Sequence, residues 1–143
     1  EYYKLPEQTR SSFRGEYFSA GDMAKMDEDG YYYLVDRKKN MIITGGENVF
    51  PSEVEALLTR HPAVYDAAVI GLPHDKWGEE VTAVVVKKPG REEVTEAEIA
   101  EFCKEKLAAF KRPKRIIFMK DAEMPRTATG KNLHRILREK LTS

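Results

Sequence analysis

Two apolar segments near the middle of the chain set the strongest limit on its fold. Residues 64–72 are nearly all small or apolar, which is typical of a buried strand. Residues 80–88 alternate valine and alanine with threonine and valine, so a strand here would be apolar on both faces. Pro89–Gly90 closes this second segment. The two segments therefore predict adjacent buried strands of a sheet.

Helices are predicted on both sides of these strands in the sequence. Residues 52–55 fit a capping box just after Pro51, and the helix that follows should end near His61–Pro62. A second capping box, residues 95–98, begins another helix, and a third helix is expected near the C-terminus. The three expected apolar stripes are Val54, Leu57 and Leu58; Ile99, Phe102, Cys103 and Leu107; and Leu133, Ile136, Leu137 and Leu141.

The N-terminal part of the chain has weaker patterns. Residues 1–21 show no clear period and are predicted to form an irregular tail. Residues 23–36 are predicted to form a hairpin, because residues 27–30 combine polar turn formers with a glycine. A short strand is expected at 41–43, followed by a tight loop at 44–47 in which two adjacent glycines permit unusual backbone angles.

The remaining segments complete an α+β pattern. Residues 115–119 predict another short strand, and residues 124–130 a polar loop. Strands and helices are mixed without a long βαβ series. The predicted fold class is therefore α+β, with a small mixed sheet flanked by helices and preceded by a β-hairpin.

Charge and cysteine content narrow the setting in which the chain works. The 24 Lys and Arg residues balance the 24 Asp and Glu residues, so no global field argues for nucleic-acid or membrane binding. A single cysteine, Cys103, excludes an internal disulfide, and a cytoplasmic location is the simplest interpretation. No apolar run is long enough to span a bilayer. The start at Glu1, without a methionine, indicates a piece of a longer protein.

The strongest local signal for chemistry is the segment 125–131, Pro-Arg-Thr-Ala-Thr-Gly-Lys. Its backbone N–H groups and hydroxyls could hold a phosphate or a developing oxyanion, with Lys131 as a point charge. The spacing is not that of a Walker A loop. A surface loop with a solvated lysine explains the same residues, and local pattern alone favours that explanation.

Three other segments are weaker candidates. Asp22 could accept hydrogen bonds from a ribose diol, Arg37 could reach a nucleotide, and the basic run 110–115 could meet phosphates. A turn aspartate and solvated basic loops explain them equally well or better. The histidines have no metal-ligand spacing with one another or with Cys103, so no metal site is predicted.

The order of these segments is more specific than any one of them. Residues 17–22, 36–55 and 125–131, taken in order and with their spacing, closely resemble the final third of the adenylate-forming superfamily. That superfamily includes acyl-CoA synthetases, firefly-type luciferases and the adenylation domains of peptide synthetases. Within it, the sequence is most similar to bacterial fatty-acyl or aryl acid–CoA ligases. The resemblance covers essentially the whole chain.

The resemblance implies roles in adenylation for four residues. Asp22 should bind the ribose hydroxyls of ATP or AMP, and Arg37 should assist it. Lys131 should contact the α-phosphate region and the substrate carboxylate as the catalytic lysine. Asp36 should be the hinge. Residues 1–35 would then end a large N-terminal adenylation domain, and residues 36–143 would form a mobile C-terminal lid.

The resemblance also implies a thioester-forming role for a second set. Gly45, Gly46 and Glu47 should line the pantetheine channel, and Lys111 is a candidate contact with CoA. ATP, CoA and Mg²⁺ would be substrates and ion of the full-length enzyme, none of them permanently bound. The expected partners are the N-terminal domain of the same chain and a fatty or aryl carboxylic acid. The isolated chain is expected to be inactive.

Two alternatives remain open at this point. The chain could come from an adenylation domain that loads a phosphopantetheine carrier protein, or it could be a non-catalytic nucleotide- or CoA-binding module. The sequence also departs from the family pattern at Ala20, where Thr is frequent, at Asn40, where Asp is frequent, and at Asn132, where an apolar residue is frequent. None of these departures removes a residue with a main implied role.

Overall fold

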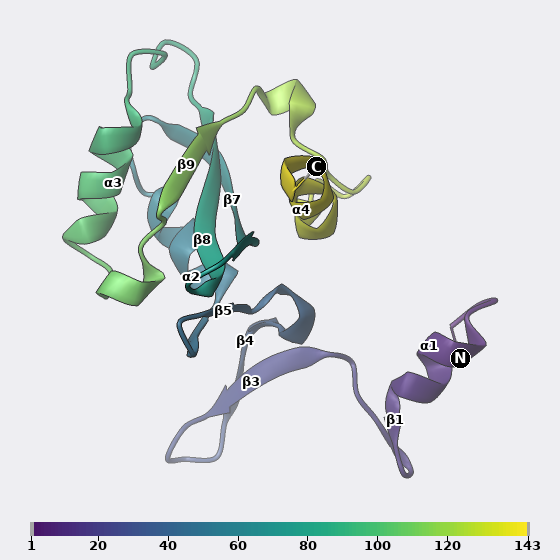
Figure 1. Cartoon of the computed structure of the whole chain (residues 1–143). Helices are drawn as coiled ribbons and strands as arrows, with labels where there is room; N and C mark the ends of the chain where they lie inside the picture. The colour runs from purple at the N-terminus through teal and green to yellow at the C-terminus, as the bar shows by residue number, and fades with distance from the viewer. Residues whose placement is uncertain (1, 143) are drawn as a thin grey trace. The chain divides into compact units, whose positions relative to one another are not determined.

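In the computed structural model, which describes residues 2–142, the chain separates into two compact units with the boundary between Lys39 and Asn40 (Figure 1). The predicted boundary at Asp36 lies inside a strand of the first unit, β4 (Tyr32–Arg37). The 3₁₀ turn η1 (Lys38–Asn40) joins the two units.

The first unit contains one short helix and two small hairpins. Helix α1 (Pro6–Ser11) is followed by β1 (Phe13–Arg14) paired with β2 (Tyr17–Phe18). The prediction of an irregular tail is therefore wrong over residues 6–18. The helix has six residues and buries none of them, so no apolar stripe marks it in the sequence. Pro6 lies in the first turn of α1, and this is the local feature that favours the start of a helix there.

The second hairpin of this unit confirms the prediction for residues 23–36. Strands β3 (Asp22–Met26) and β4 pair antiparallel around the predicted turn. The Asp27 carboxylate accepts the backbone N–H groups of Asp29 and Tyr31 at 3.1 and 2.9 Å. These bonds, with the Tyr31 amide the largest cause, lower the pKa of Asp27. An aspartate thus fixes the turn, as its residue type indicated.

The second unit is built on a five-stranded mixed sheet. Strands β5 (Ile42–Thr44) and β6 (Glu47–Val49) form a hairpin, and β7 (Val64–His74) pairs antiparallel with β8 (Gly78–Lys87) over its whole length. β9 (Arg115–Phe118) runs parallel to β8, from Thr82↔Arg115 to Val85↔Phe118. β5 shares one register pair with β8, Thr44↔Gly78. The α+β class and the small mixed sheet are confirmed.

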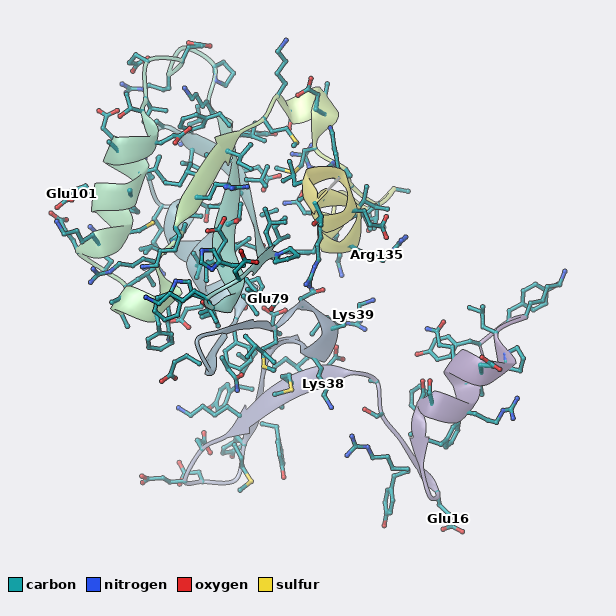
Figure 2. The ribbon with its side chains drawn as sticks, viewed as in Figure 1. Glu16, Lys38, Lys39, Glu79, Glu101 and Arg135 are labelled. Carbon is teal, nitrogen blue, oxygen red and sulfur yellow. The ribbon has the colours of Figure 1, made fainter. Side chains whose placement is uncertain are left out.

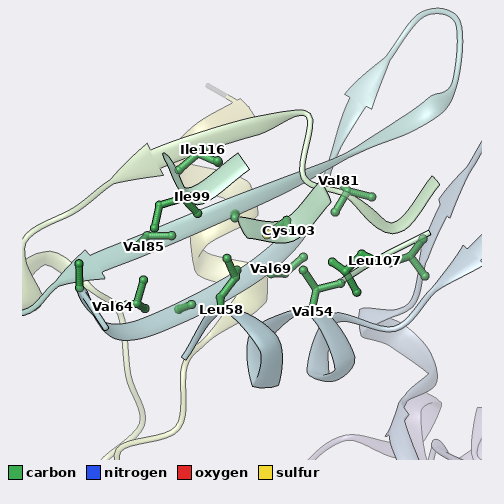
Figure 3. Packing of buried hydrophobic residues seen from close by; sticks show 14 of the residues in the cluster. Val54, Leu58, Val64, Val69, Val81, Val85, Ile99, Cys103, Leu107 and Ile116 are labelled. Atoms are coloured by element: carbon green, nitrogen blue, oxygen red, sulfur yellow. The ribbon is translucent and has the colours of Figure 1, made fainter. Parts of the chain in front are cut away.

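Helices cover both faces of this sheet. On one face, α2 (Pro51–Leu58) and α3 (Glu96–Lys104) pack on alternate residues of β7 and β8, and Figure 3 shows this core. On the other face, α4 (His134–Thr142) places Leu137 on the remaining residues. The predicted two-sided strands are confirmed: Val81, Ala83 and Val85 lie in the first core, and Val84 and Val86 in the second.

The two predicted capping boxes have different outcomes. At α3, the Thr95 hydroxyl accepts the Glu98 amide and the Glu98 carboxylate accepts the Thr95 amide, which confirms the box. At α2 the prediction is wrong, because the helix begins at Pro51 and Ser52 already lies in its first turn. Glu55 instead accepts the Val69 amide of β7 at 2.8 Å, which satisfies a donor on that edge strand.

Candidate functional site

The segment that carries Lys131 is a closed, hydrogen-bonded loop. Its base is a backbone bridge between Arg126 and Asn132, and the Thr127 amide donates to the Lys131 carbonyl at 2.8 Å. The Lys131 amide donates to the Thr127 hydroxyl at 3.1 Å, and the Thr127 and Thr129 hydroxyls lie 2.9 Å apart. The loop's own backbone and hydroxyls thus hold its shape, so Lys131 has a defined position at its end.

A carboxylate from the sheet anchors both sides of this loop. The Asp66 carboxylate, on β7, accepts hydrogen bonds from Nη2 of Arg126 at 2.6 Å and from Nδ2 of Asn132 at 3.2 Å. Arg126 also pairs with Asp121, and the two carboxylates, Asp66 first, raise its pKa further. Asn132 therefore has a structural use here that the frequent apolar residue could not supply.

The Lys131 ammonium is available to a ligand. Its side chain is exposed, and within residues 2–142 no carboxylate forms an ion pair with it. An exposed lysine whose charge is not already matched can meet an anionic group at small desolvation cost. The loop thus carries an exposed lysine without an ion-pair partner among the described residues, and two threonine hydroxyls.

In the first unit, the structure brings Asp22 and Arg37 together. They face each other in the β3–β4 register, and Nε of Arg37 lies 2.7 Å from Oδ1 of Asp22. The Asp22 side chain is about one-third exposed at 32%. A carboxylate oriented by a guanidinium in this way keeps lone pairs free for further hydroxyl donors. Asp36 lies next to this pair in β4, and its carboxylate accepts the Arg37 amide at 2.6 Å.

The predicted glycine loop is a tight turn between β5 and β6. Gly45 and Gly46 have φ of +58° and +85°, which other residues adopt with strain. The Gly45 amide donates to the Trp77 carbonyl at 2.9 Å, and a Cβ on Gly45 would lie 3.0 Å from the Trp77 ring. Gly46 and Glu47 are exposed. The turn therefore offers bare backbone to a narrow ligand, with Trp77 against its inner side.

Lys111, by contrast, is already paired. Its ammonium lies 2.8 Å from both carboxylate oxygens of Glu53 on α2, with 25% of the lysine side chain exposed. It would have to exchange this partner to contact a ligand. Of the neighbouring cations in the basic run, Arg112 donates to the Leu107 carbonyl at 2.8 Å and Arg115 lies 3.3 Å from Glu80.

The second unit keeps its two candidate regions apart. Figure 1 shows the β5–β6 turn and the loop before α4 on different sides of that unit. No group of three or more His, Cys, Asp or Glu side chains could hold a metal ion among residues 2–142. Cys103 is buried in the core, and burial raises the pKa of its thiol, so it is unreactive there.

Sequence reasoning missed the carboxylates that hold these regions in place. Asp66 and Glu55 contact the C-terminal segment, and Glu79 contacts both the Ile43 amide and Arg138 on α4. Their partners lie between 36 and 79 residues away along the chain. No local pattern marks such pairs. A partly apolar strand interrupted by a single acid, as at Asp66, is the one available signal.

Comparison with known proteins agrees with this architecture. Residues 53–131 match the family described as the AMP-binding enzyme C-terminal domain, which is more than half of the chain. The chain belongs to that family, and this confirms the resemblance to the C-terminal part of adenylate-forming enzymes. The match ends at Lys131 and lies within the second unit.

Individual relatives are similar along nearly the whole chain. The chain is 46% identical over 143 residues to the long-chain-fatty-acid–CoA ligase FadD13 of Mycobacterium tuberculosis, covering all of the chain and 28% of that protein. It is 44% identical over 138 residues to a 2-succinylbenzoate–CoA ligase of Bacillus cereus, covering 96% of the chain and 28% of that protein. The chain thus spans little more than a quarter of the length of these curated relatives.

A solved structure supports the fold independently. The crystal structure of ATP-bound MatB from Rhodopseudomonas palustris superposes with a TM-score of 0.86 at 42% identity, covering 99% of the chain and 28% of MatB. At this identity and score, the arrangement of elements is shared. No helix among residues 2–142 is long and apolar enough to cross a membrane.

Proposed function

We propose that the chain is the C-terminal lid of an ATP-dependent acid–CoA ligase, which adenylates a carboxylic acid and then forms its CoA thioester. The observation that carries the proposal is Lys131, an unpaired exposed ammonium at the end of a closed loop, where the family match also ends. The names of the relatives, which are CoA ligases, support the same reaction class.

In the proposed first half-reaction, a carboxylate oxygen of the substrate bonds to the α-phosphorus of ATP, the bond to the β-phosphate breaks, and pyrophosphate leaves. Negative charge builds around the α-phosphate as this happens. Lys131 would stabilise that charge, and removal of one such group commonly costs about a hundredfold or more in rate. Asp22, oriented by Arg37 at 2.7 Å, would accept hydrogen bonds from the ribose hydroxyls. These groups belong to different units, and Asp36 would be the hinge of the proposed enzyme.

In the proposed second half-reaction, the CoA thiol loses its proton to water and its sulfur bonds to the carbonyl carbon of the acyl-adenylate, while the bond to the phosphate oxygen breaks and AMP leaves. The turn at Gly45, Gly46 and Glu47 would line the pantetheine channel, because its backbone is exposed and carries no side chain at the glycines. Lys111 would exchange Glu53 for a CoA phosphate. Since this turn and the loop before α4 lie on different sides of the second unit (Figure 1), the unit would have to rotate between the two half-reactions.

The rest of the proposed enzyme is a large N-terminal domain of the same chain. It would supply the phosphate loop and the pocket for a fatty or aryl acid, and Mg²⁺ would arrive with the ATP phosphates. The first unit supports this partner: none of residues 2–39 is buried, and aromatic side chains such as Tyr31, Tyr32 and Tyr33 are exposed. We place the enzyme in the cytoplasm, where ATP and CoA are available to it.

The proposal is tested in the full-length parent enzyme by replacing Lys131 with Ala. Adenylation is measured by pyrophosphate exchange, and thioester formation is measured separately from supplied acyl-adenylate and CoA. We expect adenylation to fall about a hundredfold or more while thioester formation is largely kept. Lys140→Ala, another exposed lysine beyond the loop, is the matched control and should leave both steps unchanged. Intact adenylation in the Lys131 variant would remove the proposed catalytic role.

Carrier-protein loading is distinguished by the acceptor. The parent enzyme is assayed with free CoA and with a phosphopantetheinylated carrier protein. We expect turnover with free CoA, as the relatives' names indicate. The 143-residue chain alone is expected to show none, because the proposed phosphate loop and acid pocket lie in the N-terminal domain.

A further inference from the structure

One acidic side chain occupies the point where β5 meets the rest of the sheet. Glu79, the second residue of β8, is only 18% exposed, and Figure 2 labels it at this end of the sheet. Its Oε2 accepts the backbone N–H of Ile43 at 2.8 Å. Its Oε1 pairs with the guanidinium of Arg138 on α4. Both carboxylate oxygens are therefore used by donors from two different elements.

A glycine on the neighbouring strand, Gly71, leaves space for the Glu79 side chain. Gly71 pairs with Val81 in the β7–β8 ladder, and a Cβ on Gly71 would lie 2.9 Å from the carboxylate carbon of Glu79. Real Cβ atoms do not approach a carboxylate so closely, so any other residue at position 71 would displace it. The φ of Gly71 is not in the left-handed region. The glycine is thus needed for space over the sheet, not for a turn.

The β5–β6 hairpin has few backbone hydrogen bonds to the rest of the sheet. β5 shares a single register pair with β8, Thr44↔Gly78, and the Gly45 amide donates to the Trp77 carbonyl. The β5–β8 register pairing does not extend to Ile43. The Ile43 amide donates instead to the side-chain carboxylate of Glu79. Ile42 and Val49 anchor the hairpin in the core, and the Glu79 carboxylate fixes the backbone of β5 at Ile43, two residues before Gly45.

We propose that Glu79 is a positioning residue that holds the Gly45–Gly46 turn in place for the thioester-forming half-reaction. It touches no substrate; it acts through the Ile43 amide, two residues before the turn. The proposal rests on the proposed function of that turn. The Lys131 loop has its own anchor at Asp66, so adenylation does not depend on Glu79 in the same way.

The test uses Glu79→Gln in the full-length parent enzyme. Glutamine has one acceptor oxygen, whereas the Ile43 amide and the Arg138 guanidinium both need an acceptor here. The NH₂ group of the glutamine would therefore face one of these two donors without forming a hydrogen bond. We expect thioester formation from supplied acyl-adenylate and CoA to fall about tenfold or more, since misplacement of a positioning element has effects of this size. Adenylation should stay within about twofold. Glu80→Gln is the matched control, because Glu80 pairs with Arg115, whereas the Ile43 amide donates to Glu79.

A second set of variants separates positioning from general damage. In Arg138→Met the Ile43 bond is kept, so thioester formation should stay near the wild-type rate. In Glu79→Gln combined with Arg138→Met, the single oxygen no longer has a competing donor and can accept from Ile43. We expect this double variant to recover most of the lost rate. Failure to recover, with Arg138→Met near wild type, would overturn the proposed mechanism.

Hydrogen exchange tests the role of Glu79 without measuring catalysis, so its result does not depend on the proposed function. Hydrogen exchange of the Ile43 amide is followed in the 143-residue chain, and we expect about tenfold or faster exchange in Glu79→Gln than in Glu80→Gln. Equal exchange and equal thioester rates in these two variants would overturn the inference. A wild-type parent that forms no thioester would instead remove the proposed function, and the exchange result would still decide whether Glu79 holds the turn.

Discussion

At the scale of single residues, the two lysines with proposed roles have opposite surroundings. Lys111 is held by both oxygens of Glu53, whereas Lys131 has no ion-pair partner within residues 2–142. A cation that stabilises charge only in a transition state is most effective when nothing else neutralises it beforehand. Lys131 meets this condition. For Lys111, binding of a CoA phosphate has to compete with a pair already made.

A histidine provides a residue-scale prediction on pH. The Nδ1 of His61 accepts the Ala63 amide at 3.2 Å, and its ring lies edge-on to Phe102 at 4.9 Å. Burial lowers the pKa of His61, so the folded chain binds this proton less readily than the unfolded chain. The stability that this group contributes is therefore present above the ordinary pKa of about 6.5 and is lost as the pH falls through the lower folded value.

The measurement compares the wild type with His61→Asn. The asparagine oxygen can still accept the Ala63 amide, but it does not titrate. Urea unfolding of the 143-residue chain between pH 7.5 and pH 5 should show a larger loss of unfolding free energy in the wild type than in the variant. Parallel pH profiles for the two proteins would contradict this account of His61.

At the scale of elements, the helices, strands and turns that depend on local sequence pattern are predicted from the sequence. The two-sided strands β7 and β8 follow from their unbroken apolar composition, the β3–β4 turn from Asp27 and Gly30, and the start of α3 from its capping box. Helix α1 escaped prediction because it is short and buries nothing. The parallel pairing of β9 with β8 is a contact between distant segments, and no single segment specifies it.

In the candidate site, too, some features can be predicted from local sequence and others cannot. The loop carrying Lys131 and the Gly45–Gly46 turn are visible as polar and glycine-rich segments between apolar ones. Asp66 and Glu79, which hold them, are single acids in strands, and their partners lie 60 and 36 residues away. The position of each candidate loop is thus predictable from the sequence, whereas the contacts that fix its geometry are not.

The anchor of the Lys131 loop gives the element-scale prediction. Asp66→Asn weakens two hydrogen bonds from Arg126 and leaves two amide groups, at positions 66 and 132, facing each other. Because hydrogen bonds to charged groups contribute about 1.5–3 kcal/mol each, we expect faster amide exchange at residues 127 and 131–133, with the core amides of β8 unchanged. Glu105→Gln, which removes only an exposed pair with Lys106, is the control and should change neither region. Unchanged exchange in the loop of the Asp66 variant would show that its own backbone bonds suffice.

At the scale of the whole molecule, the two units differ in how they can be stabilised. The second unit has a core on each face of its sheet, built from fully buried side chains such as Ile42, Leu58, Ile99 and Leu137. The first unit buries none of residues 2–39 and contains most of the exposed large apolar side chains among the described residues. Burial of apolar surface is the main stabilising term in folding, so the second unit should hold its fold without help and the first should not.

Limited proteolysis tests this difference directly. In the 143-residue chain, trypsin should cut first at the exposed Arg14, Lys25, Lys38 and Lys39, and leave a resistant fragment that begins at residue 40; Figure 2 labels the last two lysines. In the full-length parent, the proposed N-terminal domain would cover the exposed aromatic residues of the first unit, so cleavage at residues 14 and 25 should slow by about tenfold or more. Cleavage at residues 38 and 39 should persist, because a hinge must stay accessible to move. Equal protection of the first and second units in the isolated chain would contradict the stability difference, and equal cleavage at residue 25 in both proteins would remove the proposed partner surface.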